Sequence, residues 1–222
     1  MIRRGGGDPA RPGMFITFEG PDGSGKSTQI RLLSERLRNA SYHVVESVEP
    51  GGTPIGQQIR RILLDPVNQE LCATTELLLM FAARAQNVEQ WIVPALVGGK
   101  IVLSDRFTDS TIAYQGAGRG LGVETVMEVD RIACHGVRPD LTLVIDIDAE
   151  AGLDRARERN RLRGGAESRI DEQSIEFHQR VREAYRELAE REPERIRWID
   201  GNAPAADVAE RVWEQVSAAL MA

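Results

Sequence analysis

A glycine-rich stretch near the N-terminus carries the clearest chemistry in the sequence. The pattern Gly-x-x-x-x-Gly-Lys-Ser runs from Gly20 to Ser27, after an apolar stretch and before a helical one. Glycines in such a turn let backbone N–H groups point inward and bind phosphate oxygens, and the helix N-terminus adds a favourable dipole. The lysine reaches the β- and γ-phosphates. We therefore expect a triphosphate site formed by Gly20, Pro21, Asp22, Gly23, Ser24, Gly25, Lys26, Ser27 and Thr28.

Two side chains could hold Mg²⁺ beside these phosphates. The hydroxyl of Ser27 is one ligand, and Asp105 follows the apolar segment 100–104, so it lies at the carboxyl end of a strand, where ligands bind in open sheets. Asp22 lies inside the loop, where phosphate repels a carboxylate unless a cation or a substrate hydroxyl lies between them. Asp22 therefore either orients bound water or sugar, or only forms the turn before Gly23.

Two arginines occupy positions that suit an anionic ligand. Arg106 follows Asp105 and could bind a phosphate with both guanidinium nitrogens, although a surface pair with Asp105 would use the same residues. Arg84 lies within an apolar helical pattern, where a charge needs a partner. Arg84 therefore contacts a ligand, pairs with a buried carboxylate, or extends its charged end to solvent along an apolar stem.

A basic segment runs from Arg155 to Arg169. It holds six arginines, at positions 155, 157, 159, 161, 163 and 169, and contains Gly164-Gly165. We expect a basic flap at about 160–172 that closes over polyphosphate and excludes water. The alternative is the solvated end of a charged helix, which is what most charge runs are.

The elements that must position these residues alternate along the chain. Strands are expected at 14–19, 42–47, 100–104, 141–147 and 196–199, and helices after residue 26 and at 55–64, 74–97 with a bend near Pro94, 123–135, 150–159, 172–190 and 205–220. This order predicts an α/β fold with a mainly parallel sheet. We expect one domain over 14–222 and a disordered N-terminal extension over 1–13.

Composition excludes several other classes. The net charge of −6 disfavours a general nucleic-acid binder, and no run of 18 apolar residues could span a membrane. Cys72 and Cys134 are too few for a disulfide framework or a cysteine-based zinc site, and the three histidines lack metal-ligand spacing. A cytoplasmic location fits this cysteine usage best.

Taken together, the motifs resemble those of the bacterial thymidylate kinase family. The resemblance rests on Phe18-Glu-Gly-Pro-Asp-Gly-Ser-Gly-Lys-Ser-Thr28, Glu49-Pro-Gly-Gly-Thr53, Asp105-Arg106-Phe107, Ser110-Thr-Ile-Ala-Tyr-Gln-Gly116, Gly118-Arg119-Gly120 and Phe177-His178-x-Arg180-Val181 with Tyr185. It implies a three-layer α/β/α P-loop fold with a five-stranded sheet and a flap. It also implies transfer of the γ-phosphoryl group of ATP to dTMP with Mg²⁺, and a homodimer.

The resemblance also implies roles for individual residues. The predicted catalytic residues are Lys26, Asp22, Arg106 and Arg159, with Arg155 and Arg169 as further choices for the flap arginine; Arg155 is also expected at ATP. The predicted dTMP contacts are Asp22, Glu49, Arg60, Met80, Phe81, Arg84, Arg106, Ser110, Tyr114 and Gln115, and the predicted metal ligands are Ser27 and Asp105. Of these, Arg84 would bind a thymine carbonyl, and Tyr114 would exclude a ribose 2′-hydroxyl.

Two positions depart from the pattern of the family. Val48 stands where many relatives carry arginine, so Arg60 is a candidate to supply that phosphate contact. Met80, with Phe81 beside it, stands where an aromatic ring usually stacks on thymine, and either side chain could cover the base. A kinase for another nucleoside monophosphate, or a non-enzymatic P-loop switch protein, remains an alternative.

Overall fold

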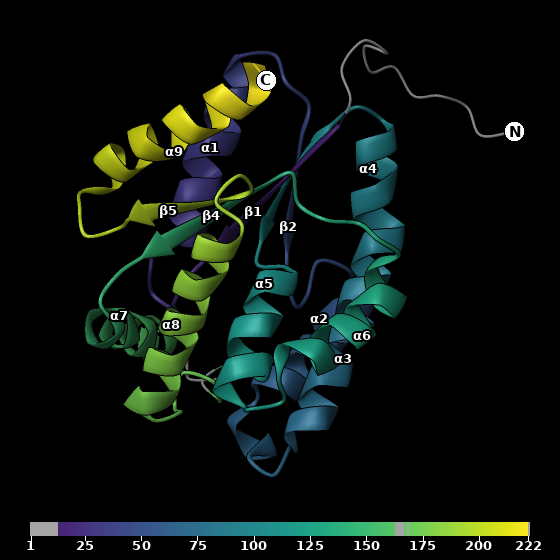
Figure 1. The fold of residues 1–222 in the computed structure, drawn as a ribbon, viewed down its shortest axis with the longest axis vertical. Helices are drawn as coiled ribbons and strands as arrows, with labels where there is room; N and C mark the ends of the chain where they lie inside the picture. The colour runs from purple at the N-terminus through teal and green to yellow at the C-terminus, as the bar shows by residue number, and fades with distance from the viewer. Residues whose placement is uncertain (1–12, 163–166, 168, 222) are drawn as a thin grey trace, which may run out of the picture.

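Five parallel strands form one sheet at the centre of the molecule, in the order β2–β3–β1–β4–β5 (Figure 1). This computed structural model describes residues 13–162, 167 and 169–221. The strands are β1 (Met14–Glu19), β2 (Val44–Val48), β3 (Ile101–Asp105), β4 (Leu141–Asp146) and β5 (Ile196–Asp200). The predicted α/β class with a parallel five-stranded sheet is therefore confirmed. The predicted extension lies outside the described residues, apart from Gly13.

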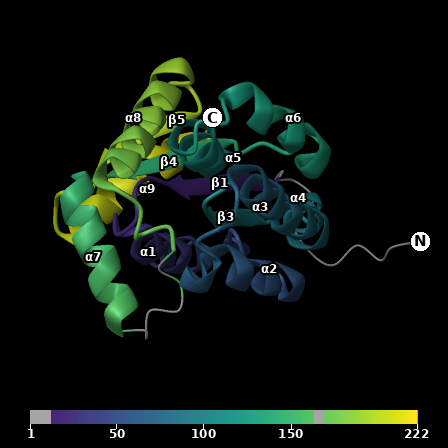
Figure 2. The same ribbon diagram turned by 90° about the horizontal axis from the view of Figure 1, so that it is seen from below.

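Helices connect the strands and cover the sheet on both faces (Figure 2). They are α1 (Lys26–Asn39), α2 (Pro54–Leu64), α3 (Ala73–Asn87), α4 (Val93–Val97), α5 (Thr108–Thr111), α6 (Val123–Cys134), α7 (Ala149–Leu162), α8 (Ile175–Arg191) and α9 (Ala205–Met221), with a 3₁₀ turn η1 (Pro66–Asn68) and two π-helical segments, η2 (Val88–Ile92) and η3 (Ile112–Gly118). None of the helices in the described residues combines the length and apolarity needed to cross a bilayer.

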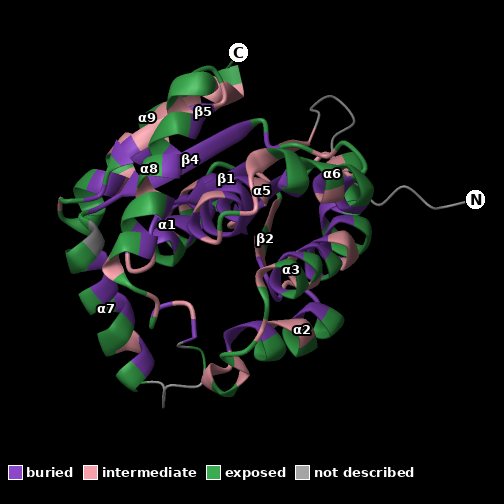
Figure 3. Ribbon diagram, turned by 60° about the horizontal axis from the view of Figure 1, so that its bottom comes forward, coloured by how far each residue is buried: buried purple, intermediate pink, exposed green. Residues whose placement is uncertain are grey.

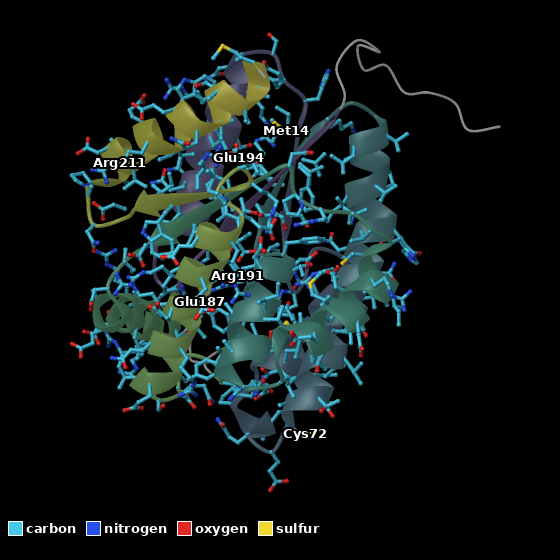
Figure 4. All side chains as sticks on the ribbon, in the orientation of Figure 1. Met14, Cys72, Glu187, Arg191, Glu194 and Arg211 are labelled. Carbon is cyan, nitrogen blue, oxygen red and sulfur yellow. The ribbon has the colours of Figure 1, made fainter. Side chains whose placement is uncertain are left out.

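The alternating side chains of β1 divide the core between the two faces of the sheet. Ile16 and Phe18 pack with the apolar residues of α1 and α9, whereas Phe15 packs with those of α3, α6 and α8. The strands run in parallel register, with Phe18 opposite Asp105, so β1 and β3 end side by side. Figure 4 places Met14, at the start of β1, at the opposite end of the molecule from Cys72, which precedes α3.

The long helix expected over 74–97 is instead a chain of three segments. It widens into η2 before Pro94, and α4 then begins at Val93. Proline lacks the N–H that would bond the carbonyl one turn back, so a wider turn before it accommodates the missing bond. The deformation therefore comes before the proline rather than at it.

Two segments near the predicted ligand residues also differ from expectation. Residues 108–118 carry α5 and η3, where no helix was expected, because β-branched residues and glycines there have low helix propensity. Helix α7 continues to Leu162, so the predicted flap begins with helical residues. Positions 163–166 and 168 of that flap lie outside the described residues.

Candidate active site

A cleft of about 710 Å³ lies over the carboxyl ends of β1 and β3. Its walls come from the loop after β1, the turn after β3, and parts of α2, α3, η3 and α7. Figure 3, with this end brought forward, shows α7 on one side and α2 on the other. The fold thus brings most of the predicted site residues together around one cavity, as expected for an open parallel sheet.

The Lys26 side chain forms hydrogen bonds with groups of its own glycine-rich loop. Its ammonium donates hydrogen bonds to the carbonyl oxygens of Gly20 (3.1 Å) and Pro21 (2.7 Å) and to the hydroxyl of Ser24 (3.3 Å). Burial, aided by the positive charge of Arg106, lowers the pKa of Lys26 to about 8. Helix α1 begins at Lys26 with no side-chain cap and no acidic residue in its first turn, which suits an anion.

The two predicted metal ligands meet beside this loop. The Ser27 hydroxyl donates a hydrogen bond to Oδ2 of Asp105 (2.8 Å), although 78 positions separate them in the chain. Both side chains line the cleft. Oxygen ligands of this type suit Mg²⁺, which commonly binds through one or two protein oxygens plus water and phosphate. No group of three or more histidine, cysteine or acidic side chains elsewhere in the described ranges could hold a metal ion.

Arg106 is the most heavily bonded side chain of the cleft. It takes a left-handed backbone conformation (φ 72°) at the end of β3. Its two terminal nitrogens donate five hydrogen bonds, to the Gly20 carbonyl (3.2 Å), Ser110 Oγ (3.0 Å), Tyr185 OH (3.1 Å), Asp22 Oδ1 (2.8 Å) and Tyr114 OH (3.0 Å). Its ion-pair partner is therefore Asp22 and not its neighbour Asp105.

Asp22 bonds side chains from other parts of the cleft, so its role is not limited to forming the turn before Gly23. Besides pairing with Arg106, it accepts a hydrogen bond from the Tyr114 hydroxyl (2.7 Å). Burial opposes ionisation, but the charges of Arg106 and Lys26 outweigh it and hold the pKa of Asp22 below its usual range. The carboxylate is thus ionised between the glycine-rich loop and Tyr114.

Arg84 has the buried carboxylate that the sequence left as an alternative. Its Nε donates to Oε2 of Glu49 (2.5 Å), and both side chains are only 3% exposed. Its Nη2 donates to the hydroxyl of Thr111 (2.9 Å). Arg84, Glu49 and Thr111 all line the cleft, so the guanidinium is held in place at the cavity wall.

The neighbouring residues Met80 and Phe81 lie in different places: one lines the cleft and the other is buried in the core. Met80 lines the cleft, whereas Phe81 is 2% exposed and packs its ring under the Arg84 guanidinium, 4.7 Å away. Of the two side chains, only Met80 therefore faces the cavity.

Three other residues that were predicted to contact dTMP also line the cleft, and each has a hydrogen-bond partner within the protein. Gln115 donates to Glu76 (2.8 Å), and Ser110 accepts from Arg106. Arg60 pairs with Glu167 (2.8 Å) and donates to the Pro50 carbonyl (2.9 Å).

The arginines of the basic segment have different surroundings. Arg155 and Arg159, one turn apart on α7, line the cleft, and Arg159 lies 3.4 Å from Asp171. Arg161 pairs with Glu158 on the exposed side of α7. Arg169 is buried and bonded to Glu76 (2.6 Å) and to the Leu63 carbonyl, which anchors the segment instead of leaving this guanidinium in the cleft. Arg163 lies outside the described residues.

The sequence interpretation missed five polar residues of the cleft: Gln57, Thr111, Asn160, Glu167 and Asp171. Burial and the nearby charge of Asp22 raise the pKa of Asp171 to about 6, and Asn160 donates to it (2.5 Å). Thr111 follows Ser110 directly, so the motif that singled out Ser110 could have indicated it. No sequence pattern pairs Asn160 with Asp171.

A glycine-rich phosphate loop, with a magnesium-type oxygen pair and several arginines lining the same cleft, defines the class of P-loop nucleotide kinases. The family model described as thymidylate kinase matches residues 18–212. The chain therefore belongs to the thymidylate kinase family, which confirms the predicted enzyme class.

Individual relatives agree with this family. The thymidylate kinase of Pelobacter propionicus is 51% identical over 92% of this chain and 94% of its own length. That of Enterococcus faecalis is 44% identical over 92% and 95% of the two chains. The crystal structure of thymidylate kinase from Ehrlichia chaffeensis, 34% identical, covers 92% of this chain and 99% of its own, with a TM-score of 0.76.

Proposed function

We propose that this cleft transfers the γ-phosphoryl group of ATP to dTMP, with Mg²⁺ as the metal, giving dTDP and ADP. The observation that carries the proposal is the position of Arg106, in the same cleft as Lys26 and the Ser27–Asp105 pair. One end of the cleft suits a triphosphate and the other an anionic acceptor. Membership of the thymidylate kinase family supports dTMP as that acceptor.

The donor end would act by positioning and by charge neutralisation. Lys26 and the first N–H groups of α1 would hold the β- and γ-phosphates, and Ser27 and Asp105 would hold Mg²⁺, which neutralises charge on the transferring group. The acceptor phosphate is already anionic, so the reaction needs no strong general base. Arg159, on α7, would add positive charge over the transferred group.

At the acceptor end, the nucleotide would replace hydrogen bonds that the site residues now make with one another. An incoming phosphate takes over N–H donors of Arg106 that now bond Asp22, Tyr114 and other groups. Met80 would cover the base, while Arg84 and Gln115 would bond its polar edge. The Tyr114 ring would leave no room for a 2′-hydroxyl.

An assay of ADP release across several acceptors tests the proposal. We expect dTMP to give the largest kcat/KM in a panel with dUMP, dCMP and AMP, and EDTA to abolish turnover. Turnover of dCMP or AMP well above that of dTMP would replace thymidylate kinase activity with another monophosphate kinase activity. Stoichiometric ATP binding without ADP release in the presence of dTMP and Mg²⁺ would instead favour a switch protein.

We also propose a cytoplasmic homodimer, with α2 and α3 in its interface. These helices pack together and expose large apolar side chains, among them Ile55, Ile62 and Leu78, each about half exposed. A second copy of the chain would bury this face, as homodimer interfaces are rich in apolar residues. Two free cysteines support a reducing compartment.

A further inference from the structure

Glu19, the last residue of β1, is a buried carboxylate that lies beneath the site without lining the cleft. Its side chain is fully buried, and three donors point at it. The backbone N–H of Phe107 bonds Oε1 (2.7 Å), while the hydroxyls of Ser110 and Tyr185 both bond Oε2, the latter at 2.9 Å. A buried charge costs free energy unless donors of this kind satisfy it.

The two hydroxyls on Glu19 are also acceptors for Arg106. Nη1 of Arg106 donates to Ser110 (3.0 Å) and to Tyr185 (3.1 Å). Each hydroxyl has one hydrogen, so giving it to Glu19 leaves the oxygen lone pairs facing the guanidinium. The third donor belongs to Phe107, the residue after Arg106, so Glu19 also fixes the backbone next to the left-handed Arg106.

We propose that Glu19 is a positioning residue for the acceptor phosphate, because through Ser110 and Tyr185 it orients the Arg106 guanidinium. This inference rests on the proposed function of Arg106 and adds a residue that touches neither nucleotide. Only a carboxylate accepts at all three bonds. The hydroxyls of Ser110 and Tyr185 also lie 2.8 Å apart, so one hydrogen can bridge them. When a neutral side chain turns its donors toward both hydroxyls, the second hydroxyl hydrogen has no acceptor left and turns toward Arg106.

Burial and the charges around Glu19 bring its pKa close to neutral pH. Burial, together with Asp109 on α5, raises the pKa of Glu19 to about 7, while Arg106 after β3 and the hydroxyls of Ser110 on α5 and Tyr185 on α8 lower it. Lys26 on α1 is a further nearby charge. Below pH 7 the network therefore shifts to the form that holds Arg106 less well.

The test measures steady-state kinetics of the full-length protein and of Glu19→Gln from pH 6 to 8.5. We expect kcat/KM for dTMP to fall about 10- to 100-fold in the variant, the loss typical of disrupting hydrogen bonds to a charged group, while KM for ATP stays within twofold. The wild type should lose activity below pH 7, beyond the effect of the dTMP phosphate, which itself titrates near pH 6. Glu19→Gln should keep only the substrate effect.

A matched control is Asp146→Asn, which removes another buried carboxylate at a strand end. Asp146 ends β4 and pairs with Arg182 (2.7 Å), and neither lines the cleft. The control should keep the wild-type KM for dTMP and the fall below pH 7. Tyr185→Phe removes one of the two connecting hydroxyls, should lower kcat/KM for dTMP about three- to tenfold, and carries the test if Glu19→Gln does not fold.

The outcomes separate this inference from the proposed function. Absence of dTMP phosphorylation by the wild type would overturn the proposed function and the Glu19 inference with it. If the wild type is active, three results with Glu19→Gln would overturn the Glu19 inference alone. The variant would keep kcat/KM for dTMP within twofold, would lose ATP and dTMP binding equally, or would keep the extra fall in activity below pH 7. For Tyr185→Phe, an unchanged kcat/KM for dTMP has the same meaning.

Discussion

Lys26 is held by its own loop before any phosphate arrives. Because its pKa is lowered to about 8, the side chain is a cation at pH 7 and increasingly neutral above pH 8 in the unliganded protein. ATP binding requires the cation, so it must take up a proton at high pH. We predict that the Kd for ATP rises above pH 8, approaching tenfold per pH unit.

Calorimetry from pH 7 to 9.5, in two buffers of different ionisation enthalpy, measures both Kd and proton uptake. Lys26→Ala should bind ATP more weakly at pH 7 and show none of this pH dependence. A constant wild-type Kd up to pH 9.5 would place the ionisation of Lys26 outside this range.

Tyr114 combines a ring at the cavity wall with a hydroxyl that bonds Asp22 and Arg106. We predict that Tyr114→Ala raises kcat/KM for UMP relative to dUMP, because the ring no longer excludes the 2′-hydroxyl. Tyr114→Phe keeps the ring and should keep the discrimination, although it removes both hydrogen bonds. An unchanged UMP-to-dUMP ratio in Tyr114→Ala would show that another group reads the sugar.

At the scale of elements, the basic segment after β4 divides into a part exposed at the cleft and a buried, anchored part. Arg159 on α7 is 41% exposed at the cleft, whereas Arg169 is 2% exposed and paired with Glu76. We predict that Arg159→Ala lowers kcat more than dTMP affinity and changes the free energy of unfolding by less than about 1 kcal/mol. Arg169→Ala should cost about 3–5 kcal/mol of unfolding free energy, since it leaves Glu76 partly unpaired.

Urea denaturation and steady-state kinetics on both variants measure the two effects. The prediction fails if Arg159→Ala keeps the wild-type kcat, which would move the catalytic role to Arg155, the next arginine on the cleft face of α7. It fails equally if Arg169→Ala unfolds at the wild-type urea concentration.

The sequence predicted these elements to different degrees. The glycine-rich loop and the Asp105–Arg106 turn were predictable because a short pattern in a strand-to-helix context determines their geometry. Residues 108–118 were not, because their helices depend on tertiary packing against α8 rather than on local propensity.

The same distinction applies to the partners of the site residues. The types of Arg106 and Glu19 indicate that each needs a partner, but several of the partners lie far along the chain. Arg106 bonds Asp22 and Tyr185, 84 and 79 positions away, and Glu19 bonds Ser110 and Tyr185, 91 and 166 positions away. Hydrogen bonds over such separations are set by the fold, so only the structure could assign them.

At the scale of the whole molecule, the apolar face of α2 and α3 predicts self-association. Leu78 is 53% exposed on α3, and placing a charge there would oppose burial by a second copy. We predict that Leu78→Arg shifts a dimeric wild type to monomer in light scattering at micromolar concentration. Met221→Arg, at an exposed position on α9, is the control and should stay dimeric. A Leu78→Arg variant that remains dimeric would place the interface elsewhere.

The cleft is rich in arginine, yet most of these guanidinium groups already have a carboxylate. The pairs are Arg60–Glu167, Arg84–Glu49, Arg106–Asp22 and Arg159–Asp171. A nucleotide entering such a cleft exchanges one anionic partner for another and displaces few mobile counterions from solution. The buried pair Arg84–Glu49 is also poorly screened. Acceptor binding should therefore tolerate changes in ionic strength far better than the number of arginines alone would suggest.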